Sequence, residues 1–262
     1  MKKARSGQHV GISYRIKLED WNDYAAESFA GGSGSEDDPY QIGNAEELAY
    51  LSKQVALGNS YQGKYFRLTN DIDLGGRQWV PIGGTMELSR LGSREERSTV
   101  PFSGIFDGNG KTIYHLEMNR LVFHAALFAS LEGAVVKNLH QEKFDIGAGL
   151  YAGSIAGDAR GASITGCRVK NGKITTLYRG GGLIASAGHS KFLDCSVDIE
   201  MYMSELENDR LMLIATLFSI NEGGYPHGYG ITGAFNNTII ENCQAIVNFN
   251  GFKDIRHVGI SH

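Results

Sequence analysis

The 262-residue chain is poor in the residues that mark several classes of protein. It has four prolines and three cysteines, and an odd number of cysteines does not favour a framework of disulfides. It has no run of 18 apolar residues, so we expect no membrane insertion. The net charge is −4, and the lysines and arginines are scattered along the chain, which gives no sign of a nucleic-acid partner.

The sequence patterns of cofactor and catalytic sites are absent or incomplete. The eight histidines show no His-Glu-x-x-His arrangement, so a zinc peptidase is not expected. Gly110-Lys111-Thr112 lacks the earlier glycine of a phosphate loop, because residue 105 is isoleucine. The glycines at 228, 230 and 233 have dinucleotide-binding spacing, but a strand pattern follows them instead of a helix. We therefore expect no cofactor, no metal ion and no catalytic residue.

Glycine is abundant, with 35 residues, which suits a fold with many tight corners. One short apolar pattern recurs, and its copies are Ile113-x-x-Leu116, Val136-x-x-Leu139, Ile164-x-x-Cys167, Phe192-x-x-Cys195 and Ile240-x-x-Cys243. The copies that start at 136, 164 and 192 are evenly spaced, while the interval before them is shorter and the interval after them is longer. Weaker copies precede the later members at Ala126-Leu127-Phe128, Gly153-Ser154-Ile155, Gly182-Leu183-Ile184 and Thr216-Leu217-Phe218. Self-similarity at such a period indicates stacked structural repeats.

The repeat predicts an all-β fold, a right-handed parallel β-helix with an N-terminal capping helix. Each copy holds short alternating strands between turn residues, and one coil alone cannot bury its apolar face. The handedness follows from the usual hand of parallel crossovers. We expect one inward column in which cysteine acts as a small apolar residue. Its members are Leu116, Leu139, Cys167, Cys195 and Cys243. Parallel side-chain directions in such a column disfavour a disulfide between Cys167 and Cys195.

The chain divides into an N-terminal extension with a linker, residues 1–38, and a single β-helix domain, residues 39–262. Alternation at residues 12–18 favours one strand, and the polar residues 31–38 are expected to form a flexible link.

Residues 44–57 form the predicted capping helix. Asn44 can cap its start, Glu47 completes a capping box, and Gly58 can end it. One face carries Leu48, Leu51 and Val55. Because a solenoid needs a cover at its end, we expect this helix to close the first coil.

Two stretches interrupt the repeat. Residues 85–100 form a charged insertion, and the long interval between the last two cysteines places a second insertion at residues 204–210 or 221–230. Insertions in a solenoid become loops and are often found on the binding face. In the second insertion Tyr225, His227 and Tyr229 lie among glycines, and exposed aromatic residues there could stack on sugar rings or anchor a protein. These three residues are the predicted binding site, and the alternative is a glycine-rich loop whose tyrosines fold back on the coil.

The chain resembles the GLUG-motif repeat surface proteins of Bacteroides-type bacteria over roughly residues 29–250, most specifically in the first half of that range. The matching segments are Phe29–Gly34, Pro39–Ile42, Glu46–Leu51, Gly63–Leu74, Trp79–Gly83 and Phe102–Gly110. The later repeats depart from the Gly-Leu-x-Gly core of that family, as in Ala126-Leu127-Phe128-Ala129. The resemblance implies an adhesin-like β-helix at the cell surface or in the medium, and it supplies no catalytic residues. A charged start without an apolar segment then predicts either a cytoplasmic protein or a chain whose export signal has been removed.

We therefore expect a non-enzymatic adhesin-like module that binds a host or microbial glycan or a surface protein; the sequence does not predict its oligomeric state. One alternative is a polysaccharide lyase or hydrolase that uses outward carboxylates such as Asp71 and Asp73. These two residues, like Asp107 and Asn109, which could contact calcium, are also typical of strand faces and turns. Another alternative is a passive spacer in a larger surface protein.

Overall fold

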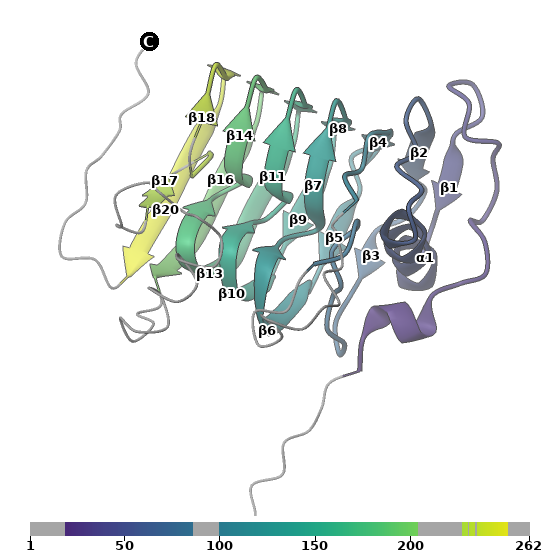
Figure 1. Cartoon of the computed structure of the whole chain (residues 1–262), viewed down its shortest axis with the longest axis horizontal. Helices are drawn as coiled ribbons and strands as arrows, with labels where there is room; N and C mark the ends of the chain where they lie inside the picture. The colour runs from purple at the N-terminus through teal and green to yellow at the C-terminus, as the bar shows by residue number, and fades with distance from the viewer. Residues whose placement is uncertain (1–18, 86–99, 204–226, 230, 234, 251–262) are drawn as a thin grey trace, which may run out of the picture.

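The structure, a computed structural model, describes residues 19–85, 100–203, 227–229, 231–233 and 235–250. Strands from successive coils lie side by side and pair in parallel, and they form three sheets around one core (Figure 1). The N-terminal end carries one short α-helix. The molecule is thus the predicted parallel β-helix with an N-terminal capping helix.

The strands of the described residues are distributed over sheets A, B and C. Sheet B contains β1 (Tyr40–Ile42), β2 (Tyr65–Leu68), β4 (Ile105–Asp107), β8 (Val135–Lys137), β12 (Ser163–Thr165), β15 (Lys191–Leu193) and β19 (Ile239–Glu241). Sheet A contains β3 (Ile72–Asp73), β5 (Thr112–Tyr114), β6 (Glu117–Ala125), β9 (His140–Glu142), β10 (Asp145–Gly153), β13 (Arg168–Gly181), β16 (Ser196–Met203), β17 (His227–Tyr229) and β20 (Gln244–Asn250). Sheet C contains β7 (Phe128–Glu132), β11 (Ala156–Arg160), β14 (Ile184–Gly188) and β18 (Phe235–Asn236).

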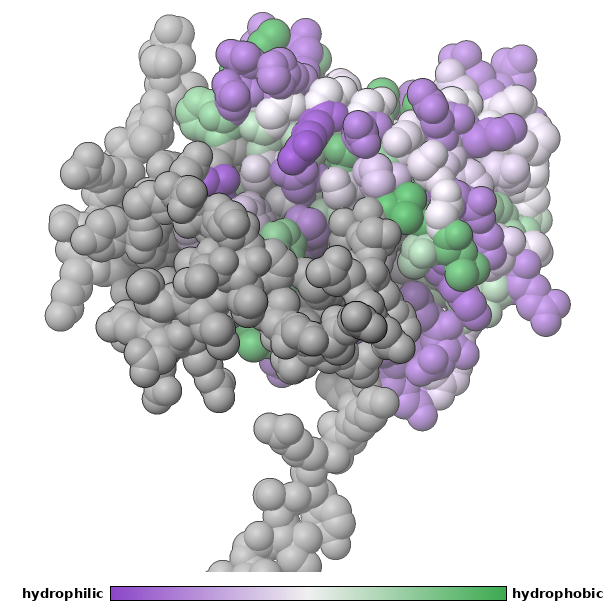
Figure 2. Space-filling view, in the orientation of Figure 1, coloured by the Kyte–Doolittle hydropathy of each residue, from purple (hydrophilic) through white to green (hydrophobic). Residues whose placement is uncertain are grey.

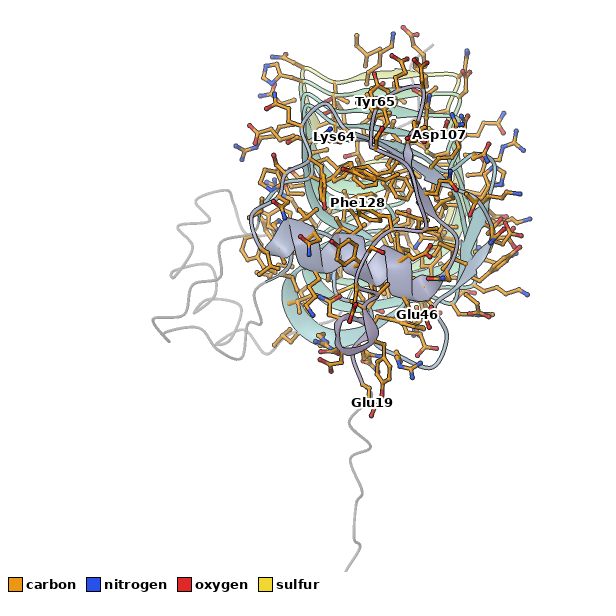
Figure 3. The ribbon with its side chains drawn as sticks, turned by 90° about the vertical axis from the view of Figure 1, so that its right-hand side faces the viewer. Glu19, Glu46, Lys64, Tyr65, Asp107 and Phe128 are labelled. Carbon is orange, nitrogen blue, oxygen red and sulfur yellow. The ribbon has the colours of Figure 1, made fainter. Side chains whose placement is uncertain are left out.

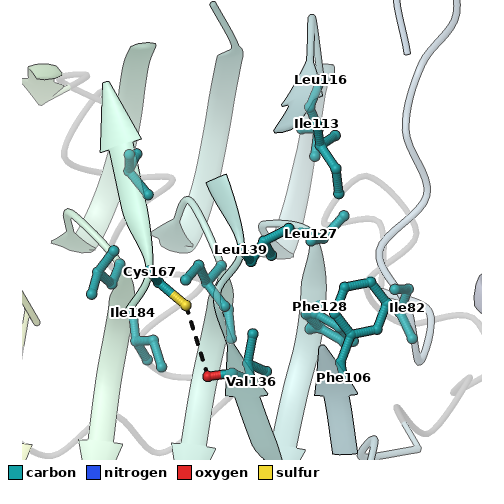
Figure 4. Close-up of a cluster of buried hydrophobic side chains, with 14 of the residues drawn as sticks. Ile82, Phe106, Ile113, Leu116, Leu127, Phe128, Val136, Leu139, Cys167 and Ile184 are labelled. Carbon is teal, nitrogen blue, oxygen red and sulfur yellow. Dashed lines mark hydrogen bonds between the residues drawn. The ribbon is translucent and has the colours of Figure 1, made fainter. Parts of the chain in front are cut away.

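The apolar repeat forms the inner wall of sheet B. Val136, Ile164 and Phe192 are paired neighbours on consecutive coils, and Phe106 precedes them in the same column. All four are fully buried, and Figure 4 shows how Phe106, Val136 and their neighbours fill the interior. The even spacing of the repeat in the sequence therefore equals one coil, as the stacked repeat predicts.

Two tight corners in every regular coil depend on left-handed backbone. The corner from sheet C to sheet B uses Gly133, Gly161, His189 and Asn237, and the corner from sheet B to sheet A uses Asn138, Gly166, Asp194 and Asn242. Their φ angles lie between 47° and 63°, a region that glycine adopts freely and that asparagine and aspartate tolerate. Their backbone N–H groups continue the ladder between coils, as from Asn138 N to Thr165 O at 2.9 Å.

The register corrects three of the predicted equivalences. Ile113 pairs with Gln141, so Leu116 lies beside Phe144 and is not in the column of Leu139 and the cysteines. A longer corner, at positions 108–111, displaces this early copy. In sheet C, Ala156 and not Ile155 pairs with Phe128 and Ile184. The residue that pairs with Ile184 in the next coil is Thr232, whereas Thr216-Leu217-Phe218 lies outside the described residues.

Three buried cysteines follow the corner residues on successive coils. Cys167, Cys195 and Cys243 are free thiols, and the Cys167 thiol donates to the carbonyl oxygen of Val136 (3.7 Å; Figure 4). The hydrogen bond with the Cys167 thiol, together with burial, raises the pKa of Cys195 to about 12. The cysteines thus act as small core residues, as expected.

Helix α1 (Ala45–Ala56) closes the N-terminal end of the core, as Figure 3 shows in a view onto that end. The Asn44 side chain accepts a hydrogen bond from the N–H of Glu47 (2.9 Å), and the Glu47 carboxylate accepts one from the N–H of Gly43 (2.6 Å). The predicted capping box is therefore present, with the reciprocal bond one residue earlier. At the other end Gly58 has a φ of 110° and follows the last turn.

The polar stretch 31–38 is folded onto the body, in contrast to the predicted flexible link. Ser33 donates its N–H to the backbone oxygen of Asp38 (3.0 Å), and Gly31 bridges to Gln41. The preceding Phe29 packs against Tyr40, with ring centroids 4.8 Å apart. Local hydrogen bonding by serine and aspartate orders this stretch. The predicted strand at residues 12–18 lies outside the described residues.

Strands β2 and β3 are separated by a bend at Asn70. The second insertion occupies the chain between β16 and β17, and most of both predicted insertions lies outside the described residues. In the part of the chain that the structure describes, no helix has the length and hydropathy needed to cross a membrane.

One core position is polar and unpaired. Gln141 is 0% exposed and lies between Ile113 and Val169 in the inner column of sheet A. Neither its amide nitrogen nor its amide oxygen has a hydrogen-bond partner. A buried amide without partners destabilises the folded state by about 1–3 kcal/mol.

We predict that Gln141→Met, which keeps the side-chain length and removes the amide, raises the free energy of unfolding by about 1–2 kcal/mol. Urea denaturation would measure the change. Gln244→Met is the matched control, because Gln244 is exposed on the same sheet and should change the stability little. A lower stability of Gln141→Met would contradict the assignment of an unsatisfied amide.

Candidate functional site

Two of the predicted binding residues, His227 and Tyr229, lie at the edge of sheet A. His227 and Tyr229 belong to strand β17, which pairs with the second half of β13, and His227 is in register with Arg179. The chain at 227–229 is therefore a strand of the solenoid, although the sequence indicates a loop through residue 230. Tyr225 lies outside the described residues. A binding role for the three residues stays a prediction.

The row that contains His227 continues across three further coils. His124, Tyr151 and Arg179 occupy the same position on β6, β10 and β13. Around this row, where sheet A meets sheet C, lies a group of aromatic and ionisable side chains that we call the junction surface. Its members are Phe123, His124, Tyr151, Asp158, Tyr178 and Arg179.

Both insertions join the solenoid next to this row. Thr85, the first residue of the first insertion, accepts a hydrogen bond from the N–H of His124 (3.1 Å) and donates one to its carbonyl oxygen (2.9 Å). The second insertion leaves sheet A after Met203 and returns at His227. Two loops that start and end at one edge of a solenoid mark the face on which ligands are commonly bound.

The aromatic rings of the junction surface are in mutual contact. The ring of Tyr151 lies 5.2 Å from Phe123, 5.7 Å from His124 and 5.9 Å from Tyr178, measured between centroids. The guanidinium carbon of Arg179 lies 5.1 Å from the Tyr178 centroid and 5.8 Å from that of Tyr151. Cation–π contacts of this kind hold an arginine side chain in a fixed orientation. A small separate apolar cluster, Leu150, Leu177 and Tyr178, supports the rings.

His124 is a buried neutral histidine. It is 8% exposed, its Nδ1 has no hydrogen-bond partner, and burial lowers its pKa to about 4. Gly157 makes room for it, since a β-carbon at that position would lie 2.7 Å from the imidazole Cδ2. The surface thus includes an imidazole that remains uncharged at neutral pH.

Asp158 is the half-buried acid of the junction surface. It lies on β11 between Ser130 and Ser186 of the neighbouring coils. Burial raises its pKa, against the opposing effects of Arg160, of a hydrogen bond with Ser186 and of Arg179. Clusters of ionisable groups with shifted pKa values are characteristic of functional sites. A histidine with a lowered pKa and an aspartate with a raised pKa occur together here.

The carboxylates considered from the sequence take part in hydrogen bonds between coils and within a turn. Asp71 accepts a hydrogen bond from the N–H of Thr112 (2.8 Å). Asp73 accepts hydrogen bonds from Gly75 (2.9 Å) and from the His115 ring (2.8 Å). Burial alone would raise the pKa of Asp73, but these hydrogen bonds and the charge of His115 outweigh it, and the pKa is lowered. A general acid requires the opposite shift.

Asp107 and Asn109 also serve a turn. The Asp107 carboxylate accepts the N–H of Asn109 (2.8 Å) and lies 3.6 Å from the Lys137 ammonium group. Among the described residues, no group of three or more histidine, cysteine, aspartate or glutamate side chains is arranged to hold a metal ion.

Sequence reasoning missed the junction surface because its members are dispersed over four strands. The signal that could have revealed it is the coil period, because Tyr151, Arg179 and His227 follow one another at the same intervals as Cys167, Cys195 and Cys243. The period thus aligns outward residues as well as core residues. In Figure 2, hydrophobic residues are scattered among hydrophilic ones over the visible described surface. That surface has no single large apolar patch that would indicate a site.

Comparisons with known proteins found one protein similar in sequence and one solved structure that aligns with the chain. No protein-family model matches it. Halomucin from Haloquadratum walsbyi is 26% identical over 173 residues, which is 61% of this chain and 2% of halomucin. The chain thus spans only a small fraction of that relative. The crystal structure of a "putative immunoglobulin A1 protease" from Bacteroides ovatus aligns with 88% of this chain and 84% of its own, at 14% identity and a TM-score of 0.41.

The last comparison corrects one prediction. The sequence led us to expect a non-enzymatic protein, but the solved structure with which the chain aligns is named as a protease. The lack of familiar catalytic motifs is therefore no ground for excluding an enzyme. At 14% identity the similarity carries no statement about a reaction of this chain.

We predict that His124 makes the stability of the fold fall as the solution becomes acidic. The unfolded chain takes up a proton near pH 6.5, whereas folded His124 does so only near pH 4. The unfolded state therefore binds more protons between these values, and stability is lost as the pH falls through them, by up to about 3 kcal/mol.

Urea midpoints at pH 7 and pH 4.5 would measure this dependence. His124→Phe should flatten it, and His189→Asn, at an exposed corner position, should leave it unchanged. An equally steep loss of stability in His124→Phe would show that other groups cause the acid sensitivity.

Proposed function

We propose that this chain is the ligand-binding module of an exported surface protein and that its junction surface binds a glycan. The observation that carries the proposal is the joint placement of Tyr151, Tyr178 and Arg179 beside both insertions. The half-buried Tyr151 offers an aromatic ring for stacking on a sugar, and the buried Tyr178 supports that ring. A fixed guanidinium group with a half-buried carboxyl group offers donors and acceptors for sugar hydroxyls. Residues on rigid strands hold this arrangement without an ordering cost on binding.

The predicted residues extend the same surface. His227 continues the row of Arg179, and Tyr229 follows two residues later on β17. Tyr225 precedes them in the second insertion. We include these three residues in the proposed site. The resemblance to surface repeat proteins of Bacteroides-type bacteria supports an exported location.

We predict that Tyr151→Ala weakens glycan binding roughly tenfold, because loss of one aromatic stacking surface costs on the order of 1 kcal/mol. A glycan array and a mucin-binding assay with the purified protein would first identify the ligand, and calorimetry would then compare the variants. Tyr114→Ala is the matched control, since Tyr114 is a half-exposed tyrosine elsewhere on sheet A.

Equal losses in both variants, or full binding by Tyr151→Ala, would place the glycan site elsewhere. Failure of the unmodified protein to bind any glycan or mucin would overturn the proposal and favour a passive spacer.

A further inference from the structure

A second polar site lies on the outer face of sheet A, away from the junction surface. Three successive coils have a residue with left-handed backbone conformation at the same bend of this sheet. These residues are His115, Lys143 and Asn171. The next coil lacks such a residue: Lys170 pairs with Asp198, whereas Gly172 pairs with Ile199. The coil that contains Asp198 is thus one residue shorter than the coil that contains Asn171. The outer surface of sheet A is recessed where that residue is missing.

This recess is an open surface depression of about 390 Å³, which we call the sheet A hollow. Its polar lining consists of Asp145, Asn171, Lys173, Asp198, Glu200 and Asn248. Its apolar floor includes Phe144, which is 3% exposed. Gly172 allows the Phe144 ring to pack against the neighbouring coil, because a β-carbon there would lie 2.0 Å from that ring. The volume is in the range of small-molecule sites.

Ion pairing leaves one side of the hollow negative. The Lys170 ammonium lies 3.0 Å from Glu142, and the Lys173 ammonium lies 3.7 Å from Asp145. Both lysines therefore pair with carboxylates of the preceding coil, and the Lys173 ammonium group also lies 5.1 Å from the Tyr202 ring centroid on the following strand. Within the described residues, no lysine or arginine pairs with Asp198 or Glu200 on the following strand, although each is in register with one of these lysines.

The two carboxylates have a fixed relation to each other. Asp198 and Glu200 are alternate residues of β16, so both side chains extend from the outer face, about 6–7 Å apart along the strand. The Glu200 carboxylate accepts a hydrogen bond from the Tyr202 hydroxyl (2.7 Å), which restricts it. A protonated amine between them could form charge-assisted hydrogen bonds to both groups.

The remaining lining is suited to hydroxyl groups. Asn171 and Asn248 lie on the two strands that flank β16, so they are on opposite sides of the two carboxylates. Each side-chain amide has donors and an acceptor. A simple alkyl ammonium ion would leave these amides unused, whereas a hydroxylated amine would match both the charge and the amides. We propose that the sheet A hollow binds an amino sugar, with its ammonium group at Asp198 and Glu200 and its hydroxyl groups at Asn171 and Asn248.

The test compares two probes that differ only in the acetylation of the amine, a glucosamine tetrasaccharide and its N-acetylated counterpart. Calorimetry at low salt and mildly acidic pH should show binding of the free amine form and little binding of the acetylated form. The double variant Asp198→Asn/Glu200→Gln should lose at least about tenfold in affinity, because two charge-assisted hydrogen bonds are weakened.

The matched control is Asp194→Asn/Glu241→Gln, which makes the same chemical changes at positions outside the hollow and should retain binding. Tyr151→Ala should also retain it, so the result is independent of the glycan site at the junction surface. Equal affinity for both probes, equal losses in the two double variants, or equally tight binding of the linear diamine putrescine would each overturn the proposal. Absence of binding by the unmodified protein would also overturn it.

Discussion

Backbone hydrogen bonding between coils at the tight corners is the constraint on which the rest of the molecule depends. The two sets of corner residues, one beginning with Gly133 and the other with Asn138, turn the chain in left-handed conformation. The N–H groups of each coil remain hydrogen-bonded to the neighbouring coil through these turns. Because each corner has the same shape, equivalent residues of consecutive coils lie one above another. The apolar columns, the cysteine column and the outward rows all follow from this alignment.

The sequence predicts the fold because the coil period is expressed in residues that face the core. Val136, Ile164 and Phe192 are paired as their spacing requires, and the capping box at Asn44 begins the only α-helix of the described chain. The corner residues directly before Leu139 and the cysteines contain the same information, but they become meaningful only when the register is known. Sequence reasoning misplaces Leu116 because a longer corner shifts its coil, and the short interval before Val136 does not show where that shift occurs.

The sites are harder to predict because they arise where the solenoid departs from regularity. The junction surface gathers residues from four strands at the edge where the insertions join, and its shifted pKa values depend on burial that only the folded chain creates. The hollow lies where the coil of β16 has no counterpart of Asn171. Neither is a local motif, since each depends on which residues of different coils become neighbours.

The cysteine column gives the molecule a set of internal reporters. Cys167, Cys195 and Cys243 lie on consecutive coils, and all three thiols are enclosed, with exposures of 0%, 1% and 7%. In a solenoid each coil is stabilised mainly by its two neighbours, so coils can separate one after another instead of all together. A thiol becomes reactive toward a modifying reagent only when its own coil opens. The order in which the three sulfur atoms are labelled would therefore record the direction in which the β-helix unwinds.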